Sequence, residues 1–165
     1  MIVQTAYPMI MICTLFWFLH IDTSAENFWW MTAYGLISNA IFCGQGYFLG
    51  IIFPEEDQVK IMNLLFVMVW VMTNGVLCNL TTASWLIVQL SKVSPSRYNC
   101  EGFFRRMVGE IPDYSKYGVP ISRDDLLDNL GYTYGDQYCM IALCVWTAIM
   151  VTLSIISIEL KFRSL

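Results

Sequence analysis

The hydrophobic pattern of this chain consists of long apolar blocks separated by short polar turns. Residues 3–20, 28–53 and 139–158 carry no Asp, Glu, Lys or Arg. Each block is long enough to cross a bilayer, because a membrane-spanning helix needs about 20 mainly apolar residues. Asp22 and Glu26 mark a polar turn after the first block, and Pro54 ends the second. The pattern therefore predicts helices that lie within a membrane.

The apolar tract 61–90 is too long for one straight span. A helix of about 30 residues at about 1.5 Å each would be about 45 Å long, whereas the hydrocarbon core is about 30 Å thick. Polar positions at Asn74–Gly75 and at 79–82 offer a place to divide it. We expect 61–78 to span, and 80–96 to be re-entrant or interfacial, with Asn79 structural at the turn. Irregular backbone at membrane depth is tolerated only against protein or a water-filled cavity, so the break predicts a cavity nearby.

The polar region 98–137 is predicted to be an outer loop that also contains short helices. Residues 98–108 mix aromatic with charged side chains, as an interfacial amphipathic helix does, and residues 122–125 look like a helix N-terminus. Arg97 and Glu101 are spaced i,i+4 and are expected to tie the re-entrant turn together. The predicted fold is an all-α membrane domain, 1–165, of about four transmembrane helices (3–20, 28–53, 61–78 and 139–158), a re-entrant helix pair and an extracellular loop.

Small and polar residues within the predicted spans have two interpretations each. Gly46 and Gly50 form a G-x-x-x-G pair, which lets helices approach closely in lipid, and we expect them to pack against a helix. The alternative is that glycine is simply commoner in membrane helices than in soluble ones. The polar side chains can bond to a neighbouring helix or line a permeation path, and these are Asn39, Asn63, Thr73 and Asn74.

Composition supports the membrane interpretation. The chain is 57% hydrophobic and 13% charged, against about 25% charged residues in soluble domains. Its net charge of −4 argues against a nucleic-acid partner. Lys60, Lys161 and Arg163 place the second turn and the C-terminus in the cytoplasm by the positive-inside rule. The basic residues of the 98–137 loop count against this orientation, although its acidic residues are at least as numerous.

The candidate chemistry is sparse. No glycine is followed directly by lysine, so a phosphate-binding loop is absent from the sequence. One histidine, His20, and six scattered cysteines give no metal site and no nucleophile–base set. Cys100 and Cys139 flank the polar loop, and a disulfide between them is left open. We expect no catalytic residue and no cofactor in this chain.

Three pieces of sequence around the break form a specific passage. They are Val76-Leu77-Cys78-Asn79-Leu80-Thr81-Thr82-Ala83-Ser84-Trp85-Leu86, then Ser94-Pro95-Ser96-Arg97-Tyr98, then Glu101. The passage resembles the ABCG (White) subfamily of ABC transporters, and the similarity covers nearly the whole chain, loosely at 112–137. The resemblance implies an ATP-driven exporter of lipids or other amphipathic molecules, working as a homo- or heterodimer of half-transporters. ATP and Mg²⁺ would bind a nucleotide-binding domain outside this chain, which would begin at the third helix, and a fragment or truncated gene model is the favoured explanation.

The resemblance also implies site residues. Val67, Met68 and Val71 would face a substrate cavity, and Val76 and Leu77 would form an apolar plug above it. The most similar subfamily member has an aromatic residue where this chain has Val67 and leucine where it has Val76, which puts aromatic stacking on a ligand in doubt. Plain helix packing is the alternative for all five residues.

A different class of protein also fits part of the pattern. A small four-span scaffold or adaptor, binding partners through its outer loop, would explain the missing ATPase without invoking truncation. It would explain neither the break in the 61–90 tract nor the ABCG-like passage. The sparse catalytic inventory disfavours a membrane-embedded enzyme.

Overall fold

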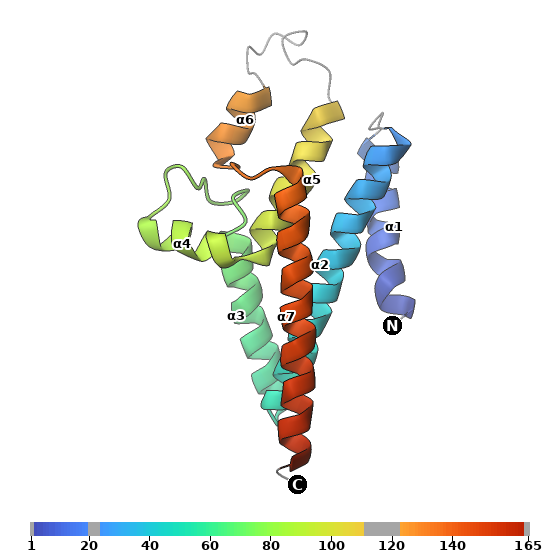
Figure 1. Ribbon diagram of the computed structural model, residues 1–165, viewed down its shortest axis with the longest axis vertical. Helices are drawn as coiled ribbons and strands as arrows, with labels where there is room; N and C mark the ends of the chain where they lie inside the picture. Colours follow the sequence, from blue (N-terminus) through green and yellow to red (C-terminus); the bar gives the residue numbers. More distant parts are fainter. Residues whose placement is uncertain (1, 20–23, 111–122, 164–165) are drawn as a thin grey trace.

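The computed structural model describes residues 2–19, 24–110 and 123–163, and helices dominate these residues (Figure 1). The all-α prediction is confirmed for this described part of the chain. Helices lie at all four ranges predicted to span, and two of them, α2 and α7, are long and apolar enough to cross a membrane. The number of spans stays a prediction. The elements are α1 (Ile2–Leu19), α2 (Ala25–Ile52), α3 (Glu56–Met72), α4 (Trp85–Val93), α5 (Pro95–Glu110), α6 (Arg123–Leu130) and α7 (Asp136–Arg163).

The centre of the molecule is the pair α2 and α7, which run side by side in the same direction (Figure 1). They approach closely at Gly44, where a Cβ would lie 3.1 Å from the Cβ of Met150. The hydroxyl of Ser154 donates to the carbonyl of Gly44 at the same level (3.3 Å). A small residue lets two helices come together in lipid, where dispersion must replace the hydrophobic drive. The buried core lies along this seam and comprises Tyr34, Ile41, Tyr98, Cys139, Leu143 and Met150.

Gly46 and Gly50, predicted to pack against a helix, do not contact one in the described residues. A Cβ added at either position would meet no atom within 4 Å. The helical periodicity explains the difference, because Gly44 and the G-x-x-x-G pair point in different directions around α2. Packing of that pair against a helix outside this chain stays a prediction.

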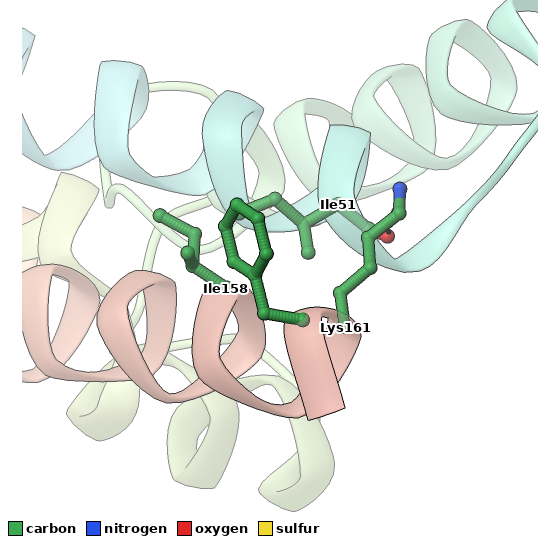
Figure 2. A pocket seen from close by; sticks show the side chains of 4 residues that line it. Ile51, Ile158 and Lys161 are labelled. Carbon is green, nitrogen blue, oxygen red and sulfur yellow. Dashed lines mark hydrogen bonds between the residues drawn. The ribbon is translucent and has the colours of Figure 1, made fainter. Parts of the chain in front are cut away.

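The turn between α2 and α3 closes the lower end of the bundle. Pro54 cannot continue α2, and Glu56 and Asp57 lie in the first turn of α3, where the helix dipole favours acidic residues. Lys161 of α7 donates to the Ile51 carbonyl, near the end of α2 (3.2 Å). Figure 2 shows Lys161 beside Ile51 and Ile158, where they line a cavity of about 210 Å³.

The 61–90 tract is divided, which confirms that it is not one straight rod. The predicted span to residue 78 is too long, because α3 ends at Met72. Thr73 Oγ1 donates back to the Val69 carbonyl (2.8 Å), and Gly75 has a φ of +87°, which glycine adopts without strain. After the turn, α4 lies across the direction of α3 (Figure 1).

The segment after the break also differs from its predicted boundaries. The re-entrant range 80–96 contains α4, Trp85–Val93, and Pro95 already begins α5. The predicted outer loop 98–137 begins with the rest of α5, where an amphipathic helix over 98–108 was expected. Proline is favoured in the first turn of a helix, and α5 continues because it packs against α2 and α7. Residues 111–122 of the predicted loop lie outside the described residues. Cys100 and Cys139 are both free thiols.

Candidate functional site: α3, the turn after it and the α4–α5 hairpin

Helix α3 presents its apolar side chains outward. All of α3 is described, and none of its residues is buried. Val67 is 36% exposed and Met68 56% exposed, and Val71 is half-buried. In a membrane protein, an apolar side chain that its own chain leaves exposed faces lipid, another subunit or a path through the protein. The three predicted cavity residues therefore lie on the surface of this chain, and the side of α3 toward α4 bounds a cavity of about 300 Å³ lined by Met62, Leu65, Phe66, Val69, Trp70, Leu90 and Val93.

The two predicted plug residues lie at the tip of the turn after α3. Asn74 Oδ1 accepts the backbone N–H of Val76 (2.8 Å) and of Leu77 (3.4 Å), so the side chain of one asparagine shapes the turn. Val76 is 55% exposed and Leu77 67% exposed. The turn therefore holds two apolar side chains outward from a fixed backbone.

The turn is anchored from the opposite side by the linker between α6 and α7. Tyr132 donates its hydroxyl to the Asn74 carbonyl (2.9 Å), and a Cβ at Gly75 would lie 2.7 Å from its ring. Leu80 is buried, and a Cβ at Gly131 would lie 2.8 Å from the Cβ of Leu80. Gly131 has a φ of +74°. The plug residues therefore rest on a base built from a distant part of the sequence.

Asn79 shapes the second half of this connection. Its Oδ1 accepts the backbone N–H of Thr81 (3.0 Å) and the Thr81 hydroxyl (2.7 Å). The predicted structural role of Asn79 is consistent with these bonds, which make a local turn that leads into α4.

The α4–α5 hairpin is held by Arg97, which is buried. Its Nη1 donates to Ser91 Oγ (2.8 Å) in α4, and its Nη2 donates to the Gly131 carbonyl (3.0 Å). The guanidinium also lies over the ring of Tyr134, 4.9 Å from its centroid. One side chain thus joins both helices of the hairpin to the α6–α7 linker.

Glu101 is the acidic centre of the same network. It is fully buried, and its carboxylate lies 3.7 Å from Arg97 Nε and 3.5 Å from Arg105 Nη2. It also accepts the backbone N–H of Tyr134. The expected Arg97–Glu101 pair is confirmed, and Arg105 extends it by donating to the Tyr132 carbonyl (2.8 Å). Burial raises the pKa of Glu101, while the Tyr134 N–H and the two arginines oppose that rise.

We expect the stability of the chain to fall as pH rises above the ordinary Glu101 pKa of 4.5. The folded protein binds the Glu101 proton more tightly than the unfolded chain does, so this contribution is complete below the unfolded pKa and is lost as pH rises through the folded pKa. The measurement is the unfolding midpoint in detergent from about pH 4.5 to about pH 7.5, compared with Glu101→Gln, which does not titrate. A difference between the two proteins that grows in favour of wild type with rising pH would contradict the expected sign.

A second polar cluster joins the upper ends of α2, α5 and α7. Tyr34 donates to Asp136 Oδ1 (2.6 Å), and Arg106 forms an ion pair with the same carboxylate. Arg106 also donates to Asn27 Oδ1 (3.0 Å) and lies 4.9 Å from the ring centroid of Trp30. The cluster fixes the start of α7 next to the α5 helix.

One polar contact lies midway along the apolar helices. Gln45 of α2 donates through Nε2 to Asn63 Oδ1 (3.1 Å) and accepts through Oε1 from Trp70 Nε1 (2.8 Å). The sequence left two interpretations of Asn63 open, and in the structure it bonds to a neighbouring helix. Thr73 and Asn74 instead bond within their own turn.

The sequence located part of this site. It indicated the break, the turn residues and the Arg97–Glu101 pair. It missed Gln45, although an amide in the uncharged block 28–53 was a signal to look for a polar partner. It also missed Tyr132 and Tyr34, because an aromatic residue with a hydroxyl carries no local sign of the helix or turn that it will contact.

Comparison with protein families gives one match that covers more than half of the chain. Residues 1–107 match the model of the ABC-2 type transporter family. The matched segment includes α1 to α4 and most of α5, and so contains α3, the turn after it and the hairpin. A search of curated proteins found no significant match.

Proposed function

The chain belongs to the ABC-2 type transporter family, and from that premise we propose that it lines the pathway of an ATP-driven exporter of lipids or other amphipathic small molecules. Family membership makes it the membrane part of an ABC-type transporter, which generally works with a nucleotide-binding partner. The proposal adds the direction of transport, the class of cargo and the residues on the path.

One observation carries the proposal. An apolar helix, α3, buries none of its side chains and ends at a turn that holds Val76 and Leu77 outward. Irregular backbone of this kind is tolerated at membrane depth against protein or a wet cavity. A second subunit packed against α3 would provide the protein contact and would enclose a wet cavity. Val67, Met68 and Val71 would then face the space between the subunits. The same arrangement disfavours a small scaffold protein, which has no need for a broken span.

The ABCG-like passage supports a finer assignment within the family. Residues 76–86, with Arg97, Tyr98 and Glu101, resemble the ABCG subfamily, and residues 79–86 resemble the breast cancer resistance protein. On this assignment the working unit is a homo- or heterodimer of half-transporters. ATP and Mg²⁺ would bind the nucleotide-binding domains, and the closing of these domains on each other would move the membrane helices.

The proposed mechanism assigns the plug residues a gating role. With the path open below, Val76 and Leu77 of two subunits meet and exclude water, because apolar side chains in contact leave no favourable site for it. After ATP binds, the substrate cavity beneath the plug residues closes, and this closure raises the free energy of the cargo in it. The cargo then displaces the two apolar side chains and leaves on the other side.

We expect Leu77→Ala in the complete transporter to change the transport rate or the basal ATPase rate. Truncation removes most of an exposed apolar side chain at the proposed constriction, which lowers the barrier to water and cargo without opening a core cavity. Transport of a fluorescent amphipathic substrate into vesicles and ATP hydrolysis without substrate are the two measurements. A change of about threefold or more is expected, which corresponds to roughly 0.7 kcal/mol.

Leu160→Ala is the matched control, because Leu160 is exposed to a similar degree at the far end of α7. It should leave both rates at the wild-type level. Unaltered transport and unaltered ATPase in Leu77→Ala would remove the plug from the mechanism.

A further inference from the structure

Helix α3 packs loosely against the rest of the chain, and Gln45 of α2 makes the side-chain hydrogen bonds that join α2 to α3. None of the α3 residues is buried, whereas Gln45 is 3% exposed. Its amide reaches two α3 residues that are two helical turns apart, Asn63 and Trp70. One side chain of α2 therefore holds α3 at two points along its length.

The chemistry of the partners permits one orientation of the Gln45 amide. The Trp70 indole N–H is a donor only, so the Gln45 oxygen must face it and the Gln45 nitrogen must face Asn63. A flipped amide would set two donors against each other at Trp70. Because a polar group left without a partner in an apolar setting is unfavourable, the side chain that satisfies all three groups also selects one rotation of α3.

The rotation is supported from a second direction. The Trp70 ring lies edge-on to that of Trp146 in α7, with centroids 6.1 Å apart. Asn63 and Trp70 thus form the face of α3 that is held by α2 and α7. Met68 lies about 140° around the helix from Asn63 and points away from the held face, whereas Val67 and Val71 lie about 40° and 80° from Asn63, on the flank of that face.

We propose that Gln45 is a positioning residue for transport: its amide fixes the rotation of α3 that turns Met68 toward the pathway. This inference rests on the proposed function, because it assigns to Gln45 the orientation of a path that α3 must line. Loss of the amide leaves α3 in place but allows it to turn about its own axis, so that the side chains facing the path change.

The test measures rotation directly by thiol labelling in membranes. Two single variants are made, Met68→Cys on the proposed path and Phe66→Cys about 200° away around α3. Each is labelled with a membrane-impermeant maleimide, and the modified fraction of the introduced cysteine is quantified by mass spectrometry over time. The labelling rate at position 68 is divided by the rate at position 66. This ratio is compared between the Gln45 protein and Gln45→Leu, which has a similar volume and no amide.

We expect Gln45→Leu to reduce the ratio by about threefold or more, since interhelical hydrogen bonds in membranes contribute a factor of about that size or larger. Trp70→Phe, which keeps a ring and removes the donor, should act in the same direction. Ser154→Ala is the control, because it deletes the α2–α7 hydrogen bond at Gly44 without touching α3, and it should leave the ratio unchanged.

The outcomes separate this inference from the proposed function. Labelling of Met68→Cys that is unchanged by Gln45→Leu and by Trp70→Phe would overturn the positioning role and leave the path intact. No labelling of Met68→Cys with Gln45 present would remove the water-accessible path, and with it the proposed function. Loss of folded protein in both Gln45→Leu and Trp70→Phe, with Ser154→Ala intact, would overturn positioning in favour of a structural role alone.

Discussion

Glu101→Ala is expected to destabilise the chain by about 3–5 kcal/mol, the cost of removing one partner from a buried ionic network. Arg97 and Arg105 would lose the carboxylate that lies 3.7 Å and 3.5 Å from them. The Tyr134 N–H would lose its acceptor as well. Because this network joins α5 to the α6–α7 linker, its loss should loosen the base under the turn that carries Val76 and Leu77.

The measurement is thermal unfolding of the purified chain in detergent, followed by tryptophan fluorescence and by the fraction that elutes as a single species. Glu56→Ala is the control, because Glu56 pairs with Lys60 at the same i,i+4 spacing on an exposed surface. An exposed pair contributes about 0–1 kcal/mol. If Glu101→Ala proved no more harmful than Glu56→Ala, the network would not hold the hairpin.

Gly102→Ala is expected to cost about 3 kcal/mol, since overpacking of a tight core costs about 1–3 kcal/mol and a hydrogen bond worth about 1 kcal/mol is disturbed with it. A Cβ at position 102 would lie 2.4 Å from two ring carbons of Tyr34. Tyr34 is fully buried and held at its hydroxyl by Asp136, so the ring has no free direction in which to retreat. The helices α2 and α5 must separate instead.

A double-mutant cycle identifies the cause. Tyr34→Ala removes the obstructing ring, so Gly102→Ala should add little to its effect, whereas independent sites would add. Gly46→Ala is the control for adding a methyl group to a helical glycine, because a Cβ there meets no atom within 4 Å. Additive losses at positions 34 and 102 would show that the two residues do not meet in the folded protein.

The membrane class and the broken span followed from simple length arguments. The 61–90 tract could not be one rod because a helix has a fixed rise per residue, and the structure divides it at Gly75. The Arg97–Glu101 pair followed from i,i+4 spacing, which is a local geometric rule. Such features depend on neighbours in the sequence, and they were predictable for that reason.

Other parts of the site were not predictable in the same way. The end of α3 at Met72 depends on side-chain bonds of Thr73 and Asn74 to the backbone, which compete with continued helix. Residues 98–108 were predicted to form an amphipathic helix at the membrane interface, and α5 is a helix over this range, but its packing against α2 and α7 could not be read from the sequence. The partners of Glu101 and Arg105 in the α6–α7 linker were equally hidden, because they are distant in the sequence.

The sequence by itself determined that the chain is helical, apolar and broken near residue 75, because rise per residue, hydropathy and glycine conformation are local properties. The tertiary structure decided which helices meet and which side of α3 is held. Gln45 with Asn63 and Trp70, Gly102 with Tyr34, and Glu101 with Tyr134 are contacts between segments distant in sequence. Their partners become neighbours only when the helices pack, so no local pattern could identify them.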